Sequence, residues 1–271
     1  MDIEHSFIYL FDESGRAILS TNDSHIFLGC GVFYDEKEEE NIFNTCDKLF
    51  NLSASKPLKN ENINDELALK IVEKIIELNI PVVCIWIDLN DGSLISVIKN
   101  YRELTIELKK HHRLPGSRKI AHILHDKILD KNIFEILDFL SNINNVTIRL
   151  KPYIDEWSIP KLERNVKLIN RSQSIEDKIS EITNLFNQNI LFKVDNFQLL
   201  KNAASKKKRF IDVITSAVSR AFKKVEKTKY ICDSSNILST NSSIKFIDYT
   251  KEIVSHINRI TDNFLKDNPV I

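Results

Sequence analysis

The sequence predicts an α/β fold: a mixed sheet, made of an antiparallel N-terminal hairpin plus parallel strands, flanked by helices. Two apolar stretches near the N-terminus, at 7–12 and 25–34, are separated by a polar segment that suits a hairpin turn. Three later apolar stretches, at 81–89, 145–154 and 189–194, alternate with long segments in which apolar residues recur at helical spacing. This alternation is typical of an α/β sheet, to which the hairpin adds an antiparallel edge.

The chain begins with two predicted strands and a helix. Residues 7–12 are rich in Phe, Ile and Tyr, which are common in strands. The stretch HIFLGCGVFY, at 25–34, carries glycines where neighbouring elements could approach closely. The segment 35–50 opens with acidic residues and is predicted to be a helix, because carboxylates interact favourably with the N-terminal end of a helix dipole.

A loop, a helix and a buried strand are predicted next. Residues 51–63 contain Pro57 and several Asn and Ser residues, which indicates a loop. The segment 64–79 has apolar residues at helical spacing, and Asn64 is its predicted N-cap. Residues 81–89 form a continuous apolar run, which is typical of a strand buried on both faces.

Apart from the predicted strands at 145–154 and 189–194, the rest of the chain is predicted to be mostly helical. Two helices are expected at 94–112 and 117–141, and a largely helical stretch at 160–187. An amphipathic helix is predicted at 209–225, and a last helix at 244–266.

One domain spanning residues 1–271 is expected. A chain of 271 residues is long enough to bury a sizeable core. It shows no internal repeat at a fixed period and no low-complexity linker. Within the domain, residues from about 94–141 are predicted to form a helical insertion, and residues from about 228–271 a helical C-terminal extension.

The composition argues against several classes of function. Lys plus Arg equals Asp plus Glu at 38 each, so the global charge gives no indication of a nucleic-acid or membrane partner. The chain has only five glycines. Neither GxGxxG nor GxxxxGKS/T is present, which argues against nucleotide binding through these two motifs.

The cysteines and the N-terminal residues bear on where in the cell the protein is expected. The four cysteines are scattered with no CxxC pair, so neither a disulfide framework nor a zinc ribbon is expected. The first residues, MDIEHSF, contain two acids and no basic region, so no secretory signal is predicted. The apolar run 80–87 is too short to span a bilayer. A cytoplasmic protein without a membrane partner is therefore expected.

Acidic residues follow apolar runs at two places and lie on one helix. Asp12 and Glu13 end the apolar run in FIYLFDESG, and Asp155 follows a second predicted strand. Asp212 lies early in the predicted helix at 209–225. Each has an ordinary structural interpretation, because acids are common in strand-end turns and at helix starts. Together, the acids could instead converge on a metal ion.

Such convergence serves metal-dependent phosphodiester hydrolysis. Mg²⁺ and Mn²⁺ bind carboxylate oxygens, and the bound ions activate the attacking water and stabilise the leaving oxygen. Acids at the ends of adjacent strands, with one acid from a helix across the sheet, give the required arrangement. The small residues 215–217 would let the helix carrying Asp212 pack close to the sheet.

Two motifs resemble a bacterial family called domain of unknown function 3800. The sequence YLFDESG at 9–15, followed by FLGCGVF at 27–33, resembles the opening of that family, and RFIDVITSAVSR at 209–220 resembles its C-terminal signature. The resemblance extends over roughly residues 7–225. It implies a ribonuclease H-like fold, in which acids on the first strand, a later strand and the final helix hold divalent metal.

The resemblance also implies roles for individual residues. Asp12 matches the first acid of the family, and Asp212 matches the helix acid. Asp155 resembles the later strand-end acid, with Asp88 as its rival because Asp88 also ends a strand. Glu13 would be a further ligand or an acid that supports the ligands. The implied catalytic set is therefore Asp12, Glu13, Asp155 and Asp212, and the implied cofactor is Mg²⁺ or Mn²⁺.

The chain departs from the pattern of the family in three positions. Asn51 and Ser53 stand where many members carry an acid and a basic residue, and Ile211 stands where Ala is usual. If the missing acid is a metal ligand, metal binding is weakened or lost.

Two further clusters have competing interpretations. Lys206, Lys207, Lys208 and Arg209 form either a solvated run or a contact with the phosphate backbone of a nucleic acid, and the second interpretation makes them the predicted nucleic-acid-binding residues. Four histidines gather at 111–125, where a solvated or partner-facing helix surface is favoured over a zinc site.

The sequence and the resemblance together predict a divalent-metal-dependent nuclease that acts on RNA or DNA. The proteins with which members of the resembled family are associated suggest a role in bacterial defence against phage or mobile elements. They also suggest a protein partner in a defence complex. The alternative is a ribonuclease H-like scaffold without activity that binds a nucleic acid or a protein partner.

Overall fold

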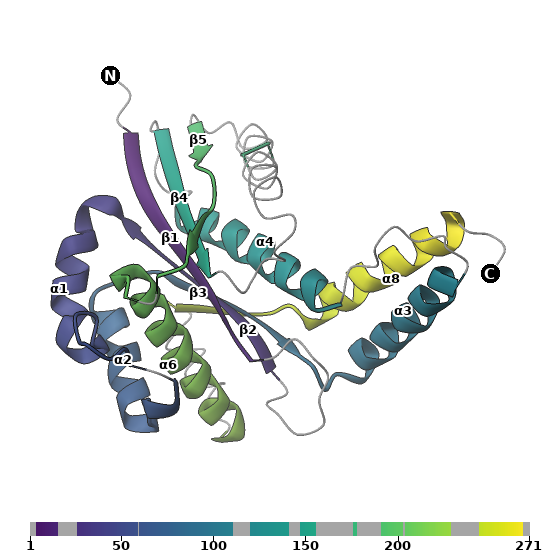
Figure 1. The fold of residues 1–271 in the computed structure, drawn as a ribbon, viewed down its shortest axis with the longest axis horizontal. Helices are drawn as coiled ribbons and strands as arrows, with labels where there is room; N and C mark the ends of the chain where they lie inside the picture. The colour runs from purple at the N-terminus through teal and green to yellow at the C-terminus, as the bar shows by residue number, and fades with distance from the viewer. Residues whose placement is uncertain are drawn as a thin grey trace.

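The computed structural model describes residues 4–15, 26–58, 60–110, 120–140, 147–155, 176–177, 191–202, 204–228 and 244–267. The strands of this part of the chain form one seven-stranded sheet in the order β5-β4-β1-β2-β3-β7, with β6 paired to β4 (Figure 1). The strands are β1 (Glu4–Ser14), β2 (Ile26–Asp35), β3 (Val82–Asp88), β4 (Thr147–Asp155), β5 (Leu191–Val194), β6 (Gln198–Leu200) and β7 (Ile244–Asp248).

The directions of the strands give the sheet its class. β1, β2 and β3 pair antiparallel in chain order, whereas β4 pairs parallel with β1 on the other side. β5 and β6 pair parallel with β4, and β7 pairs parallel with β3. A three-stranded antiparallel unit extended by parallel strands beside β1 is the ribonuclease H-like arrangement, so the predicted fold class is confirmed.

Helices cover both faces of the sheet. On one face lie α1 (Glu39–Phe50), α2 (Asp65–Glu77) and α6 (Lys206–Thr228), whose apolar residues form one core with that face. On the other lie α3 (Gly92–Lys110), α4 (Ile120–Leu140) and α8 (Thr250–Asp267), which belong to a second core. Figure 1 shows α3 and α8 side by side. Two short 3₁₀ helices, η1 (Glu36–Glu38) and η2 (Asn60–Asn62), complete the described elements.

The sequence locates most helix boundaries to within a few residues. The Asn64 side chain accepts a hydrogen bond from the Leu67 amide at 2.8 Å, so its predicted role as an N-cap is confirmed. The helices predicted at 94–112 and 117–141 correspond to α3 and α4. The helical stretch predicted at 160–187 lies outside the described residues, apart from 176–177.

The prediction of one helix at 244–266 is wrong in its first residues. Ile244–Asp248 form the edge strand β7, and α8 begins only at Thr250. Pairing with β3 satisfies one edge of this backbone, and Ile244 is buried with Phe246 packed on the same core. The predicted C-terminal extension is therefore not wholly helical, because it adds a strand to the sheet.

Two glycines of β2 allow α4 to lie close to the sheet. A Cβ atom at Gly29 would come within 2.1 Å of the Ile128 side chain, and one at Gly31 within 1.8 Å of Asn132 Oδ1. The predicted close approach at these glycines is thus confirmed. Asn132 is fully buried, donates to the Val83 carbonyl at 2.7 Å and accepts from the Tyr9 hydroxyl at 3.2 Å.

Replacing Asn132 with Ala should lower the free energy of unfolding by about 1–3 kcal/mol, because the Tyr9 hydroxyl and the Val83 carbonyl would lose a partner in a buried site. Urea unfolding of the purified protein measures the change. Asn100→Ala on the exposed side of α3 is the matched control and should leave the unfolding midpoint nearly unchanged. An Asn132→Ala variant as stable as the wild type would contradict the structural role of this side chain.

Candidate functional site

The end of β1 sends neighbouring acids to opposite faces of the sheet. Leu10 belongs to the core under α6, and Phe11 to the core under α4. Because successive side chains of a strand alternate, Asp12 lies on the α6 face and Glu13 on the α4 face. Two contacts agree: the Ser14 hydroxyl donates to Ser219 Oγ on α6 at 2.8 Å, whereas Glu13 pairs with a side chain of α4.

The carboxyl end of β4 lies beside Asp12. In the parallel ladder between β1 and β4, Phe11 stands opposite Ile154. The next position on each strand is an acid, Asp12 on β1 and Asp155 on β4. Neighbouring strands are separated by about 4.8 Å, so the two backbone positions are adjacent. The side chain of Asp155 lies outside the described part of the structure.

A polar stripe on α6 faces this strand end. Asp212 and Ser219 are separated by seven residues, and Thr215 lies between them, so the three share one side of the helix. The same helix buries Ile214 and Val218 against the sheet. The hydrogen bond from Ser14 to Ser219 shows that this side of α6 faces the end of β1.

Two contacts align α6 with β1. Near the start of the helix, Lys207 Nζ lies 5.2 Å from the centre of the Tyr153 ring, and Tyr153 stands opposite Leu10 in the ladder. Further along, Ser219 receives the hydrogen bond from Ser14. The helix therefore runs in the same direction as the last part of β1.

Asp12 and Asp212 fall between these two contacts. The helix segment 207–219 spans about 18 Å, and the strand segment 10–14 about 13 Å. Asp212 lies a little under halfway along the first segment and Asp12 halfway along the second. By this interpolation, Asp12 and Asp212 fall at a similar level along the interface between β1 and α6.

The charge of Asp212 is partly offset within its own helix. Lys208 Nζ lies 3.4 Å from Asp212 Oδ1, one turn away. The Lys208 side chain is 16% exposed, whereas that of Asp212 is 39% exposed. Asp212 therefore keeps access to solvent, while its cationic partner lies deeper.

Thr215 is a buried hydroxyl on the same stripe. It is 1% exposed, and within the described part of the chain its Oγ1 atom has no hydrogen-bond partner. Leaving such a group unpaired costs about 1–3 kcal/mol. No solvent reaches this atom, so it is not a site for a metal-bound water. Whether the residues fit a divalent ion depends on the carboxylates Asp12, Asp155 and Asp212, which are the oxygen donors that such an ion prefers. Sequence reasoning missed Thr215 and Ser219, although their spacing from Asp212 places them on its side of the helix.

Asp88, the rival strand-end acid, lies away from Asp12. The ladders connect Asp12 to Cys30 on β2, and Asp88 to Ile26 on the same strand. Two strand spacings and four residue steps separate the two acids by roughly 16 Å. The Asp88 carboxylate accepts a hydrogen bond from the Asn90 amide at 2.8 Å, which stabilises the turn after β3.

Glu13 is placed apart from the other predicted site residues. Its carboxylate pairs with His125 Nδ1 of α4, and only 9% of its side chain is exposed. The His125 ring packs edge-on against Phe27, with the ring centres 4.9 Å apart. The sheet therefore separates Glu13 from Asp12, which does not fit shared binding of one ion. His125 was expected on a solvated or partner-facing helix surface, but it faces inward, against Glu13 and Phe27. The side chains at 111, 112 and 122 lie outside the described residues.

The basic run at the start of α6 is only partly available to a ligand. Arg209 is 8% exposed and donates from Nη1 to the carbonyls of Leu52, at 2.9 Å, and Ala54, at 2.5 Å. Lys207 pairs with Glu39 at 2.6 Å. Lys206 is exposed. The prediction that all four residues contact phosphate does not fit the placement of Arg209, which anchors a loop inside the protein.

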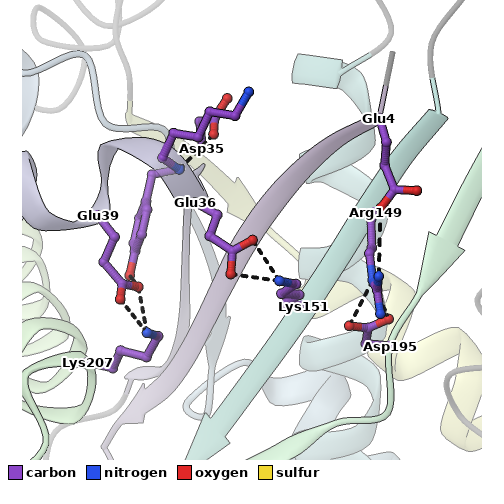
Figure 2. A network of polar contacts seen from close by, with 10 residues as sticks. Glu4, Asp35, Glu36, Glu39, Arg149, Lys151, Asp195 and Lys207 are labelled. Carbon is purple, nitrogen blue, oxygen red and sulfur yellow. Dashed lines mark hydrogen bonds and ion pairs between the residues drawn. The ribbon is translucent and has the colours of Figure 1, made fainter. Parts of the chain in front are cut away.

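Further cations near α6 and β4 are paired with acids (Figure 2). Lys151 contacts Glu36 at 2.6 Å, and Arg149 Nε contacts Asp195 at 2.9 Å. Glu39, the partner of Lys207, also accepts a hydrogen bond from the Tyr34 hydroxyl at 3.0 Å. Burial, together with the Glu39 carboxylate, raises the pKa of Tyr34 far above its ordinary value. These contacts offset the positive charge on this side of the sheet.

Asn51 and Ser53, two of the three positions that depart from the pattern of the resembled family, are parts of a turn. Asn51 ends α1 in the left-handed region, with φ 53°. The Ser53 amide donates to Asp47 Oδ1 at 2.7 Å. Because Arg209 holds the carbonyls of Leu52 and Ala54, this loop lies against the start of α6. The loop is therefore near the helix that carries the acid, but Asn51 serves as a helix C-cap.

The described residues contain neither a metal-holding cluster nor a helix that could span a membrane. Among them, no group of three or more His, Cys, Asp or Glu side chains is arranged to hold a metal ion; the side chain of Asp155 is not in that set. No helix in the described ranges is long and apolar enough to cross a membrane.

Comparisons with known proteins add little to the fold. No protein-family model matches the chain, so membership of the family domain of unknown function 3800 stays a prediction. No curated protein sequence matches it either. A solved structure that is similar is the crystal structure of Bst-RNase HIII in complex with Mn²⁺, with a TM-score of 0.40 and 13% identity, covering 95% of this chain and 70% of that chain. At this level of similarity, the assignment to the ribonuclease H-like fold rests on the strand order and directions of the chain itself.

Proposed function

We propose that this chain is a divalent-metal-dependent nuclease that hydrolyses phosphodiester bonds of RNA or DNA. Asp12, Asp155 and Asp212 would hold Mg²⁺ or Mn²⁺. The observation that carries the proposal is the convergence of three elements: β1 and β4 end side by side in acids, and the polar stripe of α6 lies across the end of β1. Carboxylates from separate rigid elements are the ligands that these hard cations prefer.

The residues of the chain have distinct tasks in this proposal. When bound, the ion supplies an activated water and offsets the charge on the phosphate. Asp12 and Asp212 provide oxygen ligands from two elements that the Ser14–Ser219 hydrogen bond holds in register. Lys206, which is exposed at the start of α6, would contact the phosphate backbone.

A specific observation supports the alternative of an inactive scaffold that binds a nucleic acid or a protein. Asn51, at the position of the missing acid, is committed to ending α1, and the Ser53 amide is bonded to Asp47. If that acid is a metal ligand in the family, a site without it holds metal less tightly. The role in bacterial defence is a prediction that comes only from the family resemblance. The same holds for a protein partner in a defence complex.

Replacing Asp12 or Asp212 with Asn should abolish cleavage while leaving the metal-free fold as stable as the wild type or more so. The reason is that gathered carboxylates repel one another without a cation, and each substitution removes one charge. Digestion of RNA, DNA and hybrid substrates with Mn²⁺ and Mg²⁺ measures activity, thermal melting in a chelator measures stability, and calorimetry measures Mn²⁺ binding.

Asp88→Asn is the matched control, because it changes the rival acid at another strand end. This variant should keep its cleavage activity and nearly all of its stability, since the amide oxygen of Asn can still accept the hydrogen bond from the Asn90 amide. Wild-type protein that binds Mn²⁺ without cleaving any substrate would support the scaffold. Cleavage retained in both Asn variants would rule out the proposed metal site.

Changing Lys206 and Arg209 separately should divide the basic run into two roles. Lys206→Gln should weaken binding to single-stranded or duplex nucleic acid without sequence preference and reduce the salt slope by about one, with no change in melting temperature. Arg209→Gln should lower the free energy of unfolding by about 1–3 kcal/mol, because buried carbonyls lose a charged donor. Lys251→Gln, an exposed change on α8, is the control for both measurements. A salt slope unchanged by Lys206→Gln would mean that this lysine does not contact phosphate.

A further inference from the structure

We propose that His125 of α4 is a positioning residue for the metal site: through Glu13 it holds the end of β1, and with it the backbone that carries Asp12. The inference rests on the proposed function, because it assigns a task at the same site. His125 does not contact the ion in this proposal. It acts from the opposite face of the sheet, and the catalytic set predicted from the sequence does not include it.

The end of β1 has less backbone support than the rest of the strand. Within the described part of the chain, β1 pairs with β2 as far as Ser14, but with β4 only as far as Phe11. The strand ends at once after Ser14, where Gly15 takes a φ of 97°. Segments with fewer backbone contacts open more readily than the core of a sheet. Asp12 lies at the start of this less supported stretch.

Side chains hold this stretch from both faces of the sheet. On one face, the Glu13 carboxylate pairs with His125 Nδ1 of α4. On the other, the Ser14 hydroxyl donates to Ser219 Oγ of α6 at 2.8 Å. The Glu13 side chain is 9% exposed and that of His125 21%, so water competes little for their contact. The two residues that follow Asp12 are therefore held from opposite sides.

His125 is itself held firmly enough to fix Glu13. Its ring packs edge-on against Phe27, with the ring centres 4.9 Å apart. Further along the same helix, the buried Asn132 accepts a hydrogen bond from the Tyr9 hydroxyl at 3.2 Å. The later helix residue thus contacts the earlier strand residue, so α4 runs opposite to β1. The His125 contact is the one at the strand end, whereas the Asn132 contact lies four residues earlier on β1.

The consequence for metal binding follows from the chemistry of the ion. Mg²⁺ demands near-ideal octahedral geometry, so small displacements of a ligand weaken its binding. Glu13 and Asp12 share a peptide unit, and a displacement of one moves the backbone of the other. Groups that orient metal ligands typically change metal affinity by about 10–100-fold when they are removed. A Glu13–His125 pair with only a structural role would change stability without changing the affinity for the ion.

The test measures metal affinity and local opening separately. Mn²⁺ binding to the full chain is measured by calorimetry for the wild type, His125→Phe and His125→Asn. The Phe ring can still pack on Phe27 but cannot bond to Glu13, so we expect about tenfold weaker Mn²⁺ binding. Asn has an amide donor in place of the ring nitrogen and should restore most of the affinity. In a chelator, hydrogen exchange at the end of β1 should be faster in His125→Phe than in the wild type.

Asn132→Ala is the matched control, because it removes a buried contact between the same helix and β1 away from the acids. This variant should lose stability, as predicted above, and keep its affinity for Mn²⁺. If His125→Phe does not fold, His125→Ala, which leaves room for water beside Glu13, repeats the comparison.

The outcomes separate this inference from the proposed function. Wild-type Mn²⁺ affinity in the folded variant without the imidazole would overturn the role of His125 and leave the proposed metal site intact. An equal loss of affinity in Asn132→Ala would also overturn it, because the effect would then come from general loosening of α4. A wild-type protein that binds no Mn²⁺ would overturn the proposed function and this inference together.

Discussion

Burial of β1 on both faces is the constraint on which the rest of the structure depends. The strand lies between β2 and β4, and its side chains alternate between two apolar cores. Leu10 and Phe11 are both fully buried, one in each core. Because the alternation continues through the strand end, Asp12 faces α6 while Glu13 faces α4. A shift of one residue would exchange the two environments and bury the wrong set of side chains.

The docking of α6 decides what Asp12 can meet. The helix combines an apolar side, which packs on the sheet, with a polar stripe turned to the strand end. Arg209 joins its first turn to the loop after α1, and Ser219 joins a later turn to Ser14. Two polar contacts therefore fix the helix along its axis, and apolar packing fixes its distance from the sheet. The acid of the helix is held at the level of the strand acid without a direct contact being required.

The charges around the site explain why the basic residues are a weak guide to function. Lys151, Lys207 and Arg149 each contact a carboxylate, so their positive charge is largely neutralised within the protein. These partly buried ion pairs lower the positive potential that a nucleic acid would meet on this surface. In the proposed nuclease, binding of a phosphate backbone would therefore depend more on a metal ion than on these basic side chains.

The sequence by itself determined the elements and their class. The apolar pattern of β1, the glycines of β2 and the Asn64 cap act locally, so each could be predicted from neighbouring residues. It could not show that Ile244–Asp248 form a strand, because only pairing with β3 stabilises the extended backbone there. The tertiary structure alone placed Asp155 beside Asp12, set Glu13 against His125 and turned Arg209 inward. These outcomes depend on strand register and helix docking, which arise from contacts between residues far apart in the chain.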